Sequence, residues 1–163
     1  MSSQALPATV DRVPESTSDK VNDRIRRTTE RNVARAARGG AGHIDRRLRE
    51  LDREWDIERT LESNAATVSL VGLGLGALVH RTFYALPAIV AIFLLQHALQ
   101  GWCPPLPVFR RWGVRTAREI EEERYALKAL RGDFRAVPAE TEEVTSERVA
   151  AALEAAASTT RSS

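Results

Sequence analysis

Two long stretches of apolar residues occupy the middle of the chain, and densely charged segments flank them on both sides. The first stretch covers residues 64–81 and the second covers residues 83–101, with the polar residues His80, Arg81 and Thr82 at the junction. A helix needs roughly 20 mostly apolar residues to cross a bilayer, and both stretches approach that length. The first contains Gly, Ser and Thr, so we expect its insertion to depend on its neighbour.

This pattern predicts an all-α protein, built as a two-helix transmembrane hairpin with helical cytoplasmic flanks and disordered termini. The alternative is a helical hairpin buried inside a soluble bundle. A helix that is apolar on all sides normally lies in a protein core or in lipid. The flanks are short and highly charged, so they offer too little apolar surface to cover two such helices, and we favour the membrane.

The N-terminal flank divides into two segments. Residues 1–43 are interpreted as a disordered or basic arm, in which residues 19–38 can form a helix capped by Ser18 or Asp19 and ended by Gly39 and Gly40. The arm either is solvated or contacts anionic lipid. Residues 44–63 are predicted to form one amphipathic juxtamembrane helix, with an apolar stripe of Ile44, Leu48, Leu51 and Trp55.

The C-terminal flank also divides into two segments. Residues 102–134 are predicted to form a turn and a cytoplasmic helix, with the helix running from about residue 114 to residue 131. Residues 135–163 form an acidic, Ala-rich tail in which residues 146–157 make a marginal helix at best.

Arginine and lysine predict the orientation of the hairpin. Both flanks are rich in these residues, whereas the junction between the apolar stretches holds only Arg81. Positive charge stays on the cytoplasmic side, so we expect a bacterial inner-membrane protein with both termini in the cytoplasm. The residues expected at the cytoplasmic membrane interface are Trp102, Trp112, Arg110 and Arg111.

Small residues recur on one face of the first apolar stretch. Gly72 and Gly76 are four residues apart and share a face with Ser69, which is the small-xxx-small pattern that lets two helix backbones approach closely in lipid. This face serves either packing within the chain or self-association into a dimer or a higher homo-oligomer. Both alternatives stay open at this point.

Composition limits the chemistry that the chain can perform. Its 163 residues include 24 Lys and Arg, 22 Asp and Glu, three His and one Cys, with a net charge of +2. We find no catalytic constellation, no phosphate-binding loop, no metal site and no cofactor motif, and we therefore expect no enzyme activity. His97 lies near the expected membrane interface, where a polar side chain has a low free-energy cost because it can reach water. It is therefore interpreted as having no special role.

The single cysteine is the one candidate reactive group. Cys103 stands in the turn Gly101-Trp102-Cys103-Pro104, followed by Arg110 and Arg111. Neighbouring positive charge favours the thiolate, which is the reactive form of cysteine. The alternative is a small, half-buried residue without reactivity.

Three features together resemble the YgaP-like transmembrane domain family of bacteria. These are the lead-in Ile57-Glu58-Arg59, the Gly101-Trp102-Cys103-Pro104 turn after two short apolar helices, and the run from Glu119 to Phe134. The resemblance covers roughly half of the chain, from about Asp56 to Phe134. It implies a membrane hairpin that dimerises through its helices and a link to sulfur-anion handling. In the family's best-known architecture a rhodanese domain precedes the hairpin, and this sequence contains no such domain.

Three hypotheses on function follow. The first is an oligomeric hairpin or scaffolding module whose partners are the lipid bilayer and other copies of the chain. The second is the handling or transport of sulfur species through Cys103. The third is a soluble nucleic-acid binder that uses the basic arm, although no nucleic acid is expected because the arm lacks aromatic residues.

Overall fold

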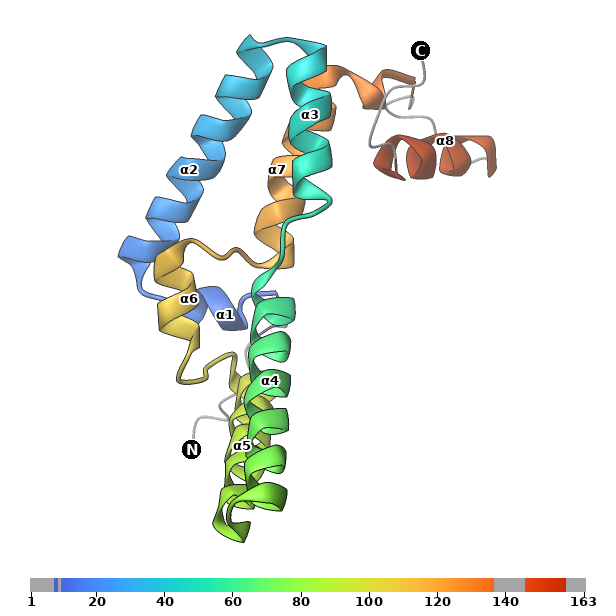
Figure 1. Ribbon diagram of the computed structural model, residues 1–163. Coiled ribbons are helices and arrows are strands. Elements are labelled where there is room, and N and C mark those ends of the chain that lie inside the picture. The colour runs from blue at the N-terminus through green and yellow to red at the C-terminus, as the bar shows by residue number, and fades with distance from the viewer. Residues whose placement is uncertain (1–7, 9, 137–145, 158–163) are drawn as a thin grey trace, which may run out of the picture. The chain divides into compact units, whose positions relative to one another are not determined.

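The computed structural model describes residues 8, 10–136 and 146–157, and these residues form helices and turns with no strand (Figure 1). The protein is therefore all-α over the described residues. It divides into two compact units. The first comprises Met1–Ile25 and Trp55–Arg118, and the second comprises Arg26–Glu54 and Glu119–Ser163.

The first unit contains the two apolar helices. Helix α4 spans Ile57–Leu78, a 3-10 turn, η1, spans Arg81–Tyr84, and α5 spans Ala85–Gln100. The two helices lie side by side as a hairpin, drawn in green in Figure 1. By length and composition, Ile57–Leu78 and Arg81–Gln100 can each cross a membrane. The prediction of two long apolar helices is thus confirmed.

The single helix predicted over residues 44–63 is wrong. Helix α3 spans Ala41–Leu51, and α4 begins only at Ile57. Asp56 adopts an extended conformation, and its carboxylate accepts a hydrogen bond from the backbone N–H of Arg59 at 2.8 Å. An aspartate in this position caps the start of a new helix. The backbone N–H of Ile57 also donates to the carbonyl of Arg115 at 2.8 Å, so the break is held by a distant part of the chain.

Two short helices complete the first unit. Helix α1 spans Arg12–Glu15 and α6 spans Leu106–Trp112. The sequence predicted only a turn after residue 101, because Pro104, Pro105 and Pro107 are concentrated there. Yet Pro107 falls in the first turn of α6, where a missing backbone N–H costs nothing. Both short helices contribute to an apolar cluster that consists of Val13, Ile57, Leu61, Cys103 and Leu106.

The second unit is built from the end of α2 and from α3, α7 and α8. Helix α2 spans Asp19–Arg38, α7 spans Ala117–Arg131, a 3-10 turn, η2, spans Asp133–Ala136, and α8 spans Ser146–Ala157. Residues 19–38 and 146–157, where the sequence allowed a helix but also disorder, are both helical. Residues 1–7 and 9 of the predicted lead-in and residues 137–145 and 158–163 of the tail lie outside the described residues. The core consists of Ala36, Ile44, Leu48, Leu51, Ile120 and Leu127.

Buried ion pairs join α3 to α7 beside this core. Arg47 donates two hydrogen bonds to the fully buried carboxylate of Glu123, at 2.6 and 3.2 Å. Burial alone lowers the pKa of Arg47, but its hydrogen bonds to Glu123 and Glu50 outweigh burial and raise the pKa above its usual value. Arg131 is likewise held by Asp133 and Asp45, each at 2.5 Å, and its hydrogen bond to Asp133 raises its pKa most. Both arginines therefore stay charged in the folded unit.

Candidate functional site

A chain of polar side chains crosses the charged end of the hairpin in the first unit. The Nε2 atom of His97, on α5, lies 2.8 Å from a carboxylate oxygen of Glu58, on α4. The second oxygen of Glu58 accepts a hydrogen bond from Arg12, on α1, at 2.7 Å. We call Arg12, Glu58 and His97 the polar cluster. It joins three helices that are far apart in sequence.

Cys103 lies next to the polar cluster. The residue is 3% exposed, and its thiol lies close to the His97 ring. The second ring nitrogen of His97, Nδ1, is buried and makes no hydrogen bond to the described residues. The Glu58 carboxylate thus fixes one ring nitrogen of the imidazole, and the other ring nitrogen has no hydrogen-bond partner among the described residues.

Gly101 explains how the turn places the thiol there. Its φ of +75° lies in the left-handed region, and its N–H donates to the carbonyl of His97 at 2.7 Å, which ends α5. A Cβ atom at this position would lie 2.3 Å from the carbonyl oxygen of Arg12. Only glycine tolerates both the backbone conformation and this close approach. The turn therefore brings Cys103 back against His97.

An apolar cavity of about 460 Å³ opens beside Cys103 in the first unit. Its walls come from α4, from α5 and from the two prolines that follow the cysteine. They consist of Leu61, Asn64, Ala65, Val68, Ile89, Val90, Phe93, Leu94, Cys103, Pro104 and Pro105. The buried thiol therefore adjoins a space that a small apolar or sulfur-bearing molecule can occupy.

The structure places the small-residue face of the first apolar helix against the second. A Cβ atom at Gly72 would lie 2.8 Å from Pro87 and 3.0 Å from Leu86, and one at Gly76 would lie 2.6 Å from the Tyr84 ring. Ser69, on the same helix, is half-buried. Gly72 and Gly76 are thus used for packing within the chain, which was one of the two alternatives that the sequence left open.

The expected interface residues occupy two kinds of environment. Trp112 is 74% exposed and Trp102 is 38% exposed, and Arg111 is exposed as well. Arg110, in contrast, is 1% exposed and donates to Asn22 at 2.9 Å and to the carbonyl of Val114 at 3.0 Å. Arg110 is therefore part of the interior of the first unit, and its expected place at an exposed interface needs correction.

Sequence reasoning found Cys103 but missed the residues that surround it. His97 was interpreted as having no special role, and Arg12 fell in a segment predicted to be disordered. Polar residues within apolar segments are often functional, and that signal was present for His97. Glu58 carried a weaker signal, as part of the Ile57-Glu58-Arg59 lead-in. Arg12 carried none.

The arrangement has the parts of an activated nucleophile. A cysteine becomes reactive when a nearby imidazole takes its proton, and a carboxylate that holds the imidazole fixes its orientation. Glu58 holds His97 in the second of these ways, and the Cys103 thiol lies close to the same ring. Among the described residues, no group of three or more His, Cys, Asp or Glu side chains is placed to hold a metal ion.

No family model, curated protein or solved structure matches this chain. The resemblance to the YgaP-like transmembrane domain family therefore stays a prediction.

Proposed function

We propose that this chain is a membrane protein whose two apolar helices cross a lipid bilayer as a hairpin. The observation that carries the proposal is how little of these helices the chain itself covers. In the most apolar window of each span, 22% of Ile57–Leu78 and only 6% of Arg81–Gln100 is buried. A core helix of a soluble protein would be mostly covered by the rest of the chain.

The exposed side chains of the hairpin support a lipid environment. They include several of the largest apolar residues of the chain, among them Leu70 at 69%, Leu78 at 88%, Ile92 at 65% and Leu95 at 62% exposure. Burying an aliphatic side chain of this kind stabilises a protein by about 1.5–3 kcal/mol, and this stabilisation is lost at each position where the side chain stays in water. Contiguous apolar surface of this extent normally contacts lipid or a partner.

Charge distribution supports one orientation. Arginines flank the hairpin on the side of both termini, and Arg81 alone stands at its turn. We therefore place both termini in the cytoplasm of a bacterial cell, with the hairpin in the inner membrane. Assembly into homo-oligomers and a scaffolding role are part of this proposal, with the lipid-facing side chains rather than Gly72 and Gly76 as the contact surface.

Membrane fractionation of the full chain with a C-terminal reporter tests insertion and orientation. We expect the protein in the membrane fraction, resistant to extraction by alkaline carbonate. A C-terminal reporter that works only in the cytoplasm should be active, and one that works only outside the cytoplasm should be inactive. The control carries charges in both spans, for example Leu73→Arg with Ile92→Arg, and should be extracted. Recovery of the original chain in the soluble fraction without detergent would contradict the proposal and favour the soluble nucleic-acid binder.

A second candidate function is thiol chemistry on sulfur species at Cys103. The observation that favours it is the buried His97, which Glu58 orients at 2.8 Å and whose other ring nitrogen has no hydrogen bond among the described residues. The apolar cavity beside the thiol offers room for a small reactant. The geometry suits a cysteine thiolate that takes the outer sulfur of a persulfide, whose remaining sulfur leaves as a thiolate, and then passes that sulfur on to a second thiolate, in keeping with the family resemblance.

Alkylation of Cys103 in native membranes tests this candidate. The chain has one cysteine, so a small reagent such as iodoacetamide reports on Cys103 alone. We expect Glu58→Gln and His97→Asn to slow modification by about tenfold, because a weaker base leaves less thiolate. Glu62→Gln, one turn further along α4, is the matched control and should leave the rate unchanged. A thiol that reacts only after denaturation would exclude this function and leave the membrane proposal intact.

A further inference from the structure

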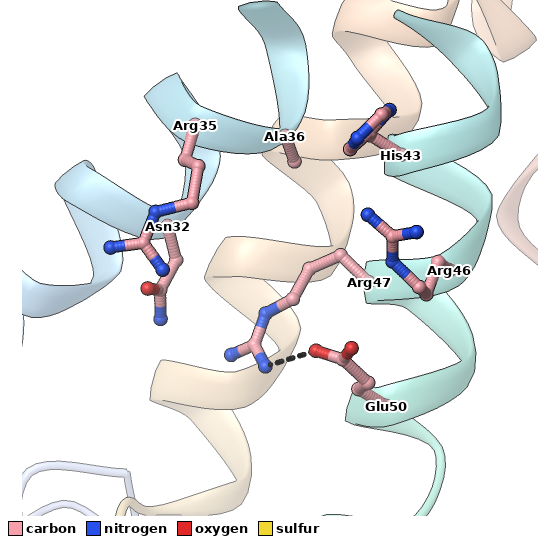
Figure 2. Close-up of a pocket in the computed structure, with 7 residues that line it drawn as sticks. All are labelled: Asn32, Arg35, Ala36, His43, Arg46, Arg47 and Glu50. Atoms are coloured by element: carbon pink, nitrogen blue, oxygen red, sulfur yellow. Dashed lines mark hydrogen bonds and ion pairs between the residues drawn. The ribbon is translucent and has the colours of Figure 1, made fainter. Parts of the chain in front are cut away.

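The second unit contains a cavity of about 230 Å³ between α2 and α3. Its walls are mainly basic and amide side chains, namely Asn32, Arg35, Ala36, His43, Arg46, Arg47 and Glu50. Figure 2 shows that Arg46 and Arg47 extend from α3 toward α2, which carries Asn32 and Arg35. Two helices thus direct guanidinium groups at one space.

The charges around this cavity are not balanced. Arg47 is neutralised by Glu123 and by Glu50, whose carboxylate lies 3.0 Å away, as the dashed line in Figure 2 indicates. Glu50 is the one carboxylate that lines the cavity among the described residues. Arg35 and Arg46 have no ion pair or hydrogen bond with any residue that the structure describes. The three arginines therefore outnumber the two carboxylates, and the cavity keeps a net positive charge with Arg35 and Arg46 outside any ion pair.

Buried contacts hold the walls of the cavity in place. Ala36, on α2, belongs to the core of the second unit together with Ile44 and Leu48, on α3. Glu123 is fully buried and fixes the Arg47 guanidinium with two hydrogen bonds. The ring of His43 lies against Gly39, where a Cβ would come within 2.3 Å of it. The cavity is thus a pre-organised part of the unit, and its unpaired arginines are the parts free to close on a ligand.

We infer that this cavity binds a phosphate group. A guanidinium presents a planar fork of N–H donors that matches two oxygens of a phosphate, and Arg35 and Arg46 supply two such forks from two sides. The Asn32 amide adds neutral donors. A negatively charged phosphate monoester complements the net positive charge of the cavity. The lining contains no flat apolar aromatic surface for stacking a nucleobase, which favours a phosphate ester over single-stranded nucleic acid.

The phosphate can belong to a soluble metabolite or to a lipid headgroup, and the shared chemistry is the monoester. The inference rests on the second unit alone. It does not require that the hairpin crosses a membrane, so the two proposals can fail separately.

Calorimetric titration of the full chain in a non-ionic detergent tests the site. The ligands are glycerol 3-phosphate and water-soluble dihexanoyl phosphatidic acid, at about 0.15 M salt to screen distant charges. We expect saturable binding of both. Equal affinities identify a soluble phosphate ester as the ligand class, and tighter binding of the lipid identifies a headgroup.

Variants decide whether the cavity is the site. We expect Arg35→Gln and Arg46→Gln each to weaken binding by about tenfold or more, because each removes a charge-assisted pair. Asn32→Asp keeps the side-chain size but adds a negative charge to the cavity, so it should abolish binding. Arg49→Gln removes the same charge from α3 outside this cavity, and it should change the affinity less than about threefold.

Two results would overturn the inference. One is the absence of saturable binding to either ligand. The other is an equal loss of affinity in Arg49→Gln and in Arg46→Gln, which would indicate general attraction to a basic surface. Circular dichroism of each variant shows that the helices are intact. Asn32→Asp, which removes no cation, keeps the test informative if an arginine variant fails to fold.

Discussion

Replacing Glu123 with Ala is expected to destabilise the packing of α3 on α7 by about 3 kcal/mol. Glu123 is fully buried, and its carboxylate accepts two hydrogen bonds from Arg47. Removing the acid leaves the half-buried cation of Arg47 without its principal partner. Breaking a buried ion pair costs far more stability than breaking an exposed one, because the remaining charge is removed from water and has lost its main counterion.

Hydrogen exchange followed by mass spectrometry measures this effect locally. Peptides from α3 and α7 should exchange roughly 100-fold faster in Glu123→Ala if opening of the second unit becomes about 3 kcal/mol easier. Glu54→Gln is the control. Glu54 lies 3.6 Å from Arg47 and is more exposed than Glu123, so its replacement should cost less than about 1 kcal/mol.

The double variant Arg47→Met with Glu123→Leu sharpens the test. It removes both charges and fills the same space with apolar atoms, so most of the lost stability should return. If the single Glu123→Ala variant exchanges at the rate of the unmodified chain, the Arg47–Glu123 pair does not hold α3 to α7.

Replacing Gly76 with Leu is expected to separate the two helices of the hairpin. A Cβ atom alone would come within 2.6 Å of the Tyr84 ring, so a leucine forces the ring and the start of α5 outward. Overpacking a close contact costs about 1–3 kcal/mol, and adding Gly72→Leu should increase the cost, because Pro87 and Leu86 are equally close there.

Gly74 provides a matched control for this prediction. It lies on the same helix between the two glycines, and a Cβ atom there meets nothing within 4 Å. Gly74→Leu therefore adds the same apolar volume without a clash. We expect the thermal unfolding midpoint in detergent to fall for Gly76→Leu and to stay unchanged or rise for Gly74→Leu.

The dependence on concentration separates packing within the chain from packing between chains. Since Gly76 faces Tyr84 of its own chain, the loss of stability in Gly76→Leu should not change with the ratio of protein to detergent. A loss that grows on dilution would indicate that this face joins two copies.

The apolar helices were predictable because their signal is local. A run of uncharged residues is visible in composition alone, and the helix over residues 19–38 is framed by capping residues and by Gly39-Gly40. The break before Ile57 was not predictable from periodicity, because charged residues continue a helical pattern through residues 52–54. What ends the pattern is the Asp56 cap together with a hydrogen bond from Ile57 to Arg115, and the second of these is non-local.

The candidate site also combines a local signal, which the sequence shows, with long-range contacts, which it does not show. Cys103 was identifiable as the only thiol in a proline-rich turn. Its surroundings were not, because Glu58 is 39 residues from His97 and 46 residues from Arg12. Contacts over such separations depend on how the helices fold back on one another. No spacing rule within a single helix encodes them.

The contact between the N-terminal segment and the end of the hairpin has a consequence for the order of biosynthesis. Arg12 leaves the ribosome 46 residues before Glu58. Ser16 leaves it 84 residues before Gln100, whose carbonyl accepts a hydrogen bond from Ser16. The segment that carries Arg12 and Ser16 must therefore wait for nearly the whole hairpin before all of its contacts can form. His97, the other partner of Glu58, is synthesised 39 residues after it, so the set of polar contacts around Glu58 is complete only after both apolar helices have been made.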